Sequence, residues 1–186
     1  MFIQTEPTPN PLTLKFLPGK VVMETGTAFY ENSSEAEKSP MAKRMFAIDG
    51  VTGVFFGSDF ITITKKNELD WQILKPTILG AISDHYNSGE KIIDDLSDKQ
   101  KADHSSENDT DIVIQIKELL DTRVRPAVAA DGGDIVFQKY ENGIVYLHMQ
   151  GACSGCPSST ATLKMGIENM LKHYIPEVKE VNSINA

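Results

Sequence analysis

A short acidic segment near the middle of the chain limits what this sequence can fold into. Residues 94–109 hold six Asp and Glu against two Lys, which accounts for half of the net charge of −8. The segment has no aromatic and no β-branched residue, so it cannot bury enough apolar surface to offset the entropy lost on ordering. We therefore expect a disordered linker between two small domains, residues 1–93 and residues 110–186.

The composition excludes several classes of partner. Hydrophobic residues make up 40% and charged residues 24% of the chain, as is usual for globular proteins. No apolar run approaches the roughly 20 residues of a membrane-spanning helix, and the acidic balance would repel a phosphate backbone. We expect neither a membrane nor a nucleic acid as partner. Residues 1–4 resemble no targeting signal, which predicts a bacterial type of cytoplasm, or the mitochondrial matrix if the chain is processed.

The first half is predicted to be a ββαββα domain. An alternating strand at residues 12–16 precedes a helix that Ser39 and Pro40 open. Residues 51–64 form a hairpin around a Gly-Ser-Asp turn, and Asp70 caps a last helix that ends near residue 89. This half has no cysteine and only one histidine, His85, so we expect no set of metal ligands in it.

The second half is predicted to be an αββαβ domain. Apolar residues at helical spacing indicate a helix over residues 113–124, which Pro126 should end. Strands at residues 135–140 and 144–149 flank an Asn-Gly pair that favours a tight hairpin turn. A second helix should bury the following side chains and end before Pro176: Leu163, Ile167, Met170, Leu171 and Tyr174. Both halves therefore belong to the α+β class.

The residues that carry chemistry lie between the last predicted strand and helix, in the run Gly-Ala-Cys-Ser-Gly-Cys-Pro at residues 151–157. Pro157 suits the first turn of a helix, which puts Cys156 at or beside the N-cap, where free N–H groups stabilise a thiolate. Two intervening residues let both sulfurs face one metal centre, and Gly155 allows the tight turn. Cys153 and Cys156 are therefore the predicted metal ligands.

A cysteine pair with this spacing has three possible uses. A redox dithiol normally follows a strand in a βαβ unit, whereas here an antiparallel hairpin precedes the pair. Structural zinc needs four ligands, and His148, the nearest histidine before the pair, lies in mid-strand. An iron–sulfur cluster usually takes four thiolates, which two copies of the chain would supply about a two-fold axis. The residues alone do not separate a shared cluster from shared zinc.

Other polar features have plain explanations. We interpret residues 131–134, Asp-Gly-Gly-Asp, as a turn that enters a strand, and Arg123 and Arg125 as solvated residues at a helix end. No triad or acid–base pair accompanies the cysteines, so we expect no enzyme activity.

The sequence resembles the Nfu family in both halves. Arg125-Pro126, the Asp-Gly-Gly-Asp run and the cysteine motif are similar to the C-terminal domain of NifU and Nfu proteins. Thr8-Pro9-Asn10-Pro11 and Lys15-Phe16-Leu17-Pro18-Gly19 resemble the Nfu N-terminal domain. The resemblance covers nearly the whole chain except the acidic segment.

This resemblance implies a carrier or scaffold for iron–sulfur clusters. It implies one [4Fe–4S] cluster per homodimer, with Cys153 and Cys156 of each copy as the ligands. It also implies delivery to apo iron–sulfur proteins, such as lipoyl synthase and aconitase-type enzymes, and contact with upstream assembly proteins. A thiol–disulfide oxidoreductase and a zinc-bridged structural dimer are the alternatives.

Overall fold

The structure, a computed structural model, describes residues 1–94, 110–155 and 157–184. The chain divides into two compact units, residues 1–100 and residues 101–186. The predicted linker lies outside the described residues except for Asp94. Mixed helix and sheet in two domains confirms the expected fold class, and each unit is described by itself below.

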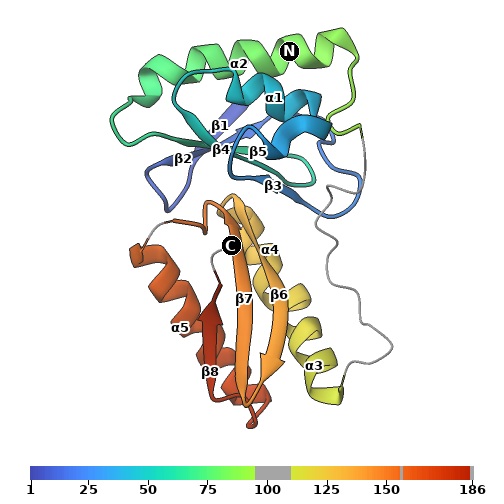
Figure 1. Cartoon of the computed structure of the whole chain (residues 1–186), viewed down its shortest axis with the longest axis vertical. Coiled ribbons are helices and arrows are strands. Elements are labelled where there is room, and N and C mark those ends of the chain that lie inside the picture. The colour runs from blue at the N-terminus through green and yellow to red at the C-terminus, as the bar shows by residue number, and fades with distance from the viewer. Residues whose placement is uncertain (95–109, 156, 185–186) are drawn as a thin grey trace. The chain divides into compact units, whose positions relative to one another are not determined.

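The first unit is an antiparallel five-stranded sheet with its helices packed on one face (Figure 1). The strand order is β1-β2-β5-β4-β3. The strands are β1 (Gln4–Pro7), β2 (Thr13–Leu17), β3 (Ala28–Tyr30), β4 (Val51–Phe56) and β5 (Ile61–Lys65). The helices are the 3₁₀ turn η1 (Glu35–Lys38), α1 (Pro40–Phe46) and α2 (Trp71–Ser88).

Most local signals in the first unit are confirmed. The Ser39 hydroxyl accepts a hydrogen bond from the Ala42 amide at 3.1 Å, and Asp70 accepts one from Gln72 at 2.9 Å, so both predicted N-caps are present. Gly89 ends α2 in the left-handed region, at φ 72°. The short strand β3 was not predicted, because three residues are too few to show a period-two pattern.

The second unit follows the predicted αββαβ order, with β7 central in a three-stranded sheet. Strand β6 pairs antiparallel to β7, and β8 pairs parallel to it. The elements are α3 (Asp111–Leu119), the π-helical turn η3 (Leu120–Val124), α4 (Arg125–Ala130), β6 (Gly133–Glu141), β7 (Ile144–Gly151), α5 (Pro157–Tyr174) and β8 (Glu180–Ser183). Asn142 and Gly143 both have positive φ, 53° and 80°, as a tight type I′ hairpin requires.

Two predictions for the second unit were wrong in detail. Pro126 does not end the first helix, because the chain widens into the π turn η3 and α4 then begins with the proline in its first turn. Tyr174 is 47% exposed rather than buried, and its ring stacks under the Arg123 guanidinium at 5.0 Å. The second unit otherwise has one apolar core, and α3, η3 and α4 all contribute side chains to it.

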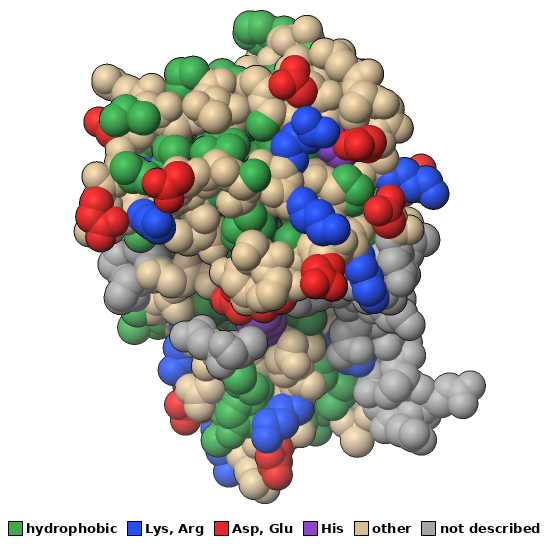
Figure 2. Space-filling model, turned by 45° about the horizontal axis from the view of Figure 1, so that its top comes forward, with side chains coloured by type: hydrophobic (Ala, Val, Ile, Leu, Met, Phe, Trp, Pro, Cys, Tyr) green, Lys and Arg blue, Asp and Glu red, His purple; other side chains and the backbone are tan. Residues whose placement is uncertain are grey.

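The surface carries both signs of charge. On the face shown in Figure 2, acidic and basic side chains are interspersed among apolar ones. Among the described residues, no helix combines the length and the apolar character that crossing a membrane requires.

Candidate metal centre

Cys153 lies in the turn that joins β7 to α5. Gly151 and Gly155 bracket it with positive φ, 63° and 77°, a conformation that costs glycine little and other residues more. The Ser154 amide donates to the Gly151 carbonyl at 3.1 Å, which closes the turn. From the helix side, the Thr160 hydroxyl donates to the Cys153 carbonyl at 3.1 Å. These contacts fix Cys153 between the strand and the helix, where the sequence placed it.

The Cys153 thiol packs against the backbone of Gly133 at the start of β6. A Cβ atom added at Gly133 would lie 2.7 Å from Cys153 Sγ and 2.6 Å from the Gln150 carbonyl oxygen. Both distances are shorter than van der Waals contact. The Ala152 amide also donates to the Gly132 carbonyl at 3.2 Å. The Gly-Gly pair therefore does more than form a turn, because the cysteine loop packs directly against its backbone.

The environment of Cys153 favours the neutral thiol. The residue is 7% exposed and belongs to the apolar core of the second unit. Burial, and then the negative charges of Asp131 and Asp134, raise the pKa of Cys153 to about 12. Since metals bind the thiolate, an incoming metal must displace this proton.

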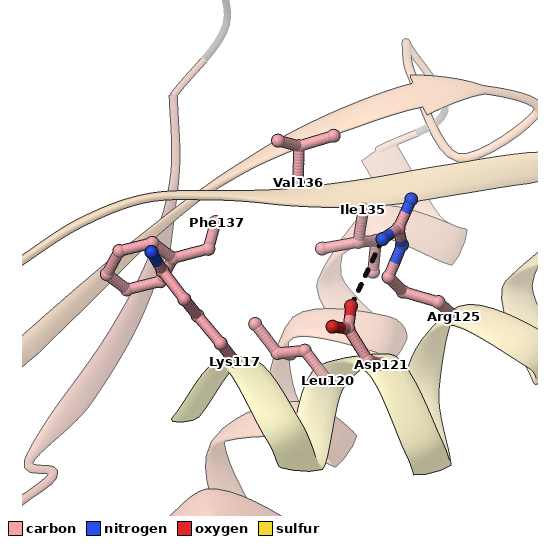
Figure 3. Close-up of a pocket in the computed structure, with 7 residues that line it drawn as sticks. All are labelled: Lys117, Leu120, Asp121, Arg125, Ile135, Val136 and Phe137. Carbon is pink, nitrogen blue, oxygen red and sulfur yellow. Dashed lines mark hydrogen bonds and ion pairs between the residues drawn. The ribbon is translucent and has the colours of Figure 1, made fainter. Parts of the chain in front are cut away.

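Arg125 forms an ion pair with one of these two carboxylates. Its Nε donates to Asp134 Oδ1 at 2.9 Å and its Nη2 donates to Asp134 Oδ2 at 2.7 Å, a bidentate pair. A third bond joins Nη1 to Asp121 Oδ1 at 3.1 Å, and Figure 3 shows Arg125 and Asp121 facing each other below β6. The hydrogen bonds to Asp134 raise the pKa of Arg125. The interpretation of Arg125 as a solvated helix-end residue was therefore wrong.

The cavity beside Arg125 is too small for a ligand. Its volume is about 10 Å³, which is room for about one water molecule. The ammonium of the buried Lys117 lies there, 5.3 Å from the Phe137 ring centroid. Arg125 thus connects α4 to β6 and closes off this part of the unit.

The second predicted ligand, Cys156, lies outside the described residues. In the sequence it directly precedes α5. Among the described residues, no group of three or more His, Cys, Asp and Glu side chains could hold a metal ion. His148 pairs with Val136 across the hairpin, and it points away from the core that contains Leu147, Met149 and Cys153. The pair Cys153 and Cys156 therefore stays a prediction.

Cys153 does not have the surroundings of an attacking redox thiol. Such thiols are partly exposed and have a lowered pKa. Cys153 is buried and its pKa is raised. This observation weighs against the oxidoreductase alternative, in which the first cysteine of the motif usually attacks.

Two α+β domains, the second with a cysteine held between a strand and a helix, define the class of NifU-like scaffold proteins. Residues 3–89 match the family described as "Scaffold protein Nfu/NifU N terminal", and residues 116–182 match the "NifU-like domain". The chain belongs to the Nfu family, whose members are scaffolds or carriers for iron–sulfur clusters and not enzymes.

Named relatives align with nearly the whole chain. NifU-like protein 4, mitochondrial, of Arabidopsis thaliana is 56% identical over 97% of this chain, which spans 65% of that protein's length. The human NFU1 iron-sulfur cluster scaffold homolog, mitochondrial, is 52% identical over 99% of this chain, which spans 72% of that protein. The solution structure of a NifU-like protein from Saccharomyces cerevisiae matches 50% of this chain and 84% of its own, with 29% identity and a TM-score of 0.46.

Proposed function

We propose that two copies of this chain bind one [4Fe–4S] cluster through Cys153 and Cys156 of each copy and transfer it to apo-proteins. The cluster is cargo rather than a resident cofactor. The observation that carries the proposal is the position of Cys153, which lies in the strand–helix turn of a NifU-like domain. The whole sequence contains two cysteines, so a single chain supplies half of the four thiolates that such a cluster usually takes.

The chemistry around Cys153 supports release as well as binding. A thiolate at this position lies near Asp131 and Asp134, whose negative charges oppose it. Burial and these negative charges therefore oppose the deprotonation of Cys153 that metal binding requires. Protonation of the thiol favours loss of the metal. A site that is shared across two copies can open by separating them, which exposes the cluster to the thiols of a recipient.

The recipients and the location are inferred from relatives. Lipoyl synthase and aconitase-type enzymes are the proposed recipients, as the family resemblance implies. The names of the relatives include "mitochondrial" and give no support to a cytoplasmic location. They favour the mitochondrial matrix, the second of the two predicted locations.

Anaerobic reconstitution tests the proposal. The loaded protein should contain four iron and four sulfide per two chains and should run as a dimer in light scattering. Cys153→Ala and Cys156→Ala should each lose stable cluster binding, because a dimer then offers two thiolates. One full cluster in a verified monomer would contradict the shared site. Zinc in place of iron after anaerobic purification would instead support the zinc-bridged structural dimer.

A further inference from the structure

The sulfur of Cys153 lies inside its own unit. It belongs to the apolar core, and a Cβ atom added at Gly133 would come within 2.7 Å of it. The space between the sulfur and the start of β6 therefore has no room for a methyl group, and none for a metal atom. A cluster that two copies share must lie outside the core of either copy. Cys153 therefore has to leave this position before it can bind such a cluster.

The turn that contains Cys153 has the features of a segment that can move. Residues 151–155 form the cysteine loop, and the glycine at each end has positive φ, 63° and 77°. Glycine changes backbone region at little cost, and hinges are a few residues that absorb such changes. Gly155 is exposed, and a Cβ atom there would meet no described atom within 4 Å. The end of the loop next to α5 therefore has space in which to turn.

A hydrogen bond from helix α5 holds the loop in its present position. The Thr160 hydroxyl donates to the Cys153 carbonyl at 3.1 Å. The helix itself is fixed, because Ile167 and Leu171 are buried in the core. Since the bond ends on the backbone of Cys153, the loop cannot carry this residue away from the helix without breaking it.

We propose that the cysteine loop has two positions and that Thr160 is the positioning residue that holds it closed. In the closed position, which the structure shows, Cys153 is stored in the core. In the open position the Thr160 bond is broken, the loop has turned about Gly151 and Gly155, and the sulfur faces solvent. The inference rests on the proposed function, because the shared cluster is what requires the open position. Storage also protects the unloaded protein, since oxidation of a thiol depends on its exposure.

Alkylation of Cys153 by iodoacetamide tests the closed position without any cluster. Cys156→Ala in the full chain leaves Cys153 as the one thiol, and each further change is made in this reference protein. When a loop opens and closes rapidly, the reaction rate is proportional to the open fraction, so the folded protein should react at least roughly tenfold more slowly than the same protein in urea. Thr160→Val removes the hydroxyl and keeps the branched shape. It should raise the rate about fivefold, the equivalent of one ordinary hydrogen bond.

Two further variants separate the Thr160 bond from a general loss of stability. Thr160→Ser keeps the hydroxyl and should react at the rate of the reference protein. Thr122→Val removes another hydroxyl bond of the same unit, which Thr122 donates to the Glu118 carbonyl at 2.7 Å, and it should also leave the rate unchanged. Peptide mass spectrometry quantifies the alkylated product, and melting curves verify folding.

The alkylation rates decide whether the two positions exist. The inference is wrong if the folded and unfolded reference proteins react alike, or if Thr160→Val reacts no faster than the reference protein. It is equally wrong if Thr160→Ser or Thr122→Val raises the rate as much as Thr160→Val does.

Anaerobic reconstitution connects the loop to loading. Thr160→Val in the chain with both cysteines should take up iron and sulfide about fivefold faster than the parent protein, because more copies are open. Unchanged uptake would contradict the role of the open position in loading. If the parent protein binds no cluster at all, the proposed function fails, and the alkylation rates still decide whether the loop has two positions.

Discussion

At the scale of single residues, the site depends on a close approach that only glycine permits. The backbone of Gly133 packs against both the Cys153 thiol and the backbone of β7. Backbone atoms cannot yield as a flexible side chain can, so a methyl group there must push β6 and β7 apart or displace the cysteine loop. The position of Cys153 is therefore set by a residue that has no side chain of its own.

Gly133→Ala should destabilise the second unit of the unloaded protein by about 1–3 kcal/mol, the usual cost of overpacking a core. Gly166→Ala is the matched control in the same unit, because the added methyl meets open space on a helix. That change should stabilise by up to about 1 kcal/mol. Urea unfolding of both variants measures the difference. Equal effects of the two alanines would show that the Gly133 contact relaxes freely.

The Arg125–Asp134 pair is the second residue-scale feature. Its Asp134 side chain is 4% exposed, and removing the cation leaves a buried carboxylate beside the cysteine loop. Arg125→Met should therefore cost about 3 kcal/mol and weaken retention of the cluster, since Asp134 then repels the thiolate in full. Arg123→Met, at an exposed arginine two residues earlier, should cost little. Chemical unfolding and iron retention after gel filtration check both variants. An Arg125→Met protein as stable as Arg123→Met would show that the pair contributes nothing.

The sequence predicts Cys153 as a ligand, but it did not predict the residues that hold the Cys153 loop in place. Cys153 is recognisable by residue type and spacing, whereas Arg125 and Asp134 meet only because α4 folds back along β6. An ion pair between residues nine positions apart produces no periodic pattern in the sequence. The contact between Gly133 and the thiol likewise depends on strand register, which residue types do not specify.

At the scale of elements, local chemistry determined most of the helices and turns. Capping residues and the Asn-Gly turn act through their immediate neighbours, so the N-caps of α1 and α2 and the β6–β7 turn were predictable. The π turn η3 was not, because the apolar spacing that places Leu120 and Val124 in the core is also that of a continuous α-helix.

Helix α2 carries a buried titratable group, His85, which is fully buried near its C-terminal end. Burial lowers the pKa of His85, and the positive charge of Arg44 on α1 lowers it further, while Glu90, 3.8 Å away, opposes the shift. Below pH 6.5 the unfolded chain therefore binds a proton that the folded unit resists. Stability should be full above that pH and should fall as the pH drops, with a slope of up to about 1.4 kcal/mol per pH unit.

His85→Leu should remove this part of the pH dependence, because leucine does not titrate. The free energies of unfolding of the parent protein and the variant, measured between about pH 5 and 8, give the contribution of His85 by difference. The His173→Leu variant serves as a matched control for the loss of one histidine, because His173 is exposed and lies on α5 of the other unit. A parent protein and His85→Leu variant with parallel curves would show that His85 titrates alike in both states.

At the scale of the whole molecule, the positions of the two cysteines lead us to expect different roles for the two units. Both lie in the second unit, so we expect the first unit to act on the proposed cluster only indirectly. Its compact core and its own sheet make it a separate folding unit. We therefore expect coupling between the two halves to depend on the length of the connecting segment.

The acidic segment should act by its length rather than by its order of residues. Residues 94–109 are rich in like charges and poor in apolar groups, and chains of this composition repel themselves and contact little. Scrambling these residues at constant length should leave the rate of cluster transfer to an apo-protein nearly unchanged. Deleting most of them should slow transfer severalfold, because the two halves then lose reach. Transfer is followed by the gain of activity of a recipient enzyme mixed with loaded protein under anaerobic conditions. A large loss on scrambling alone would mean that the segment contains a recognition sequence, which its composition does not predict.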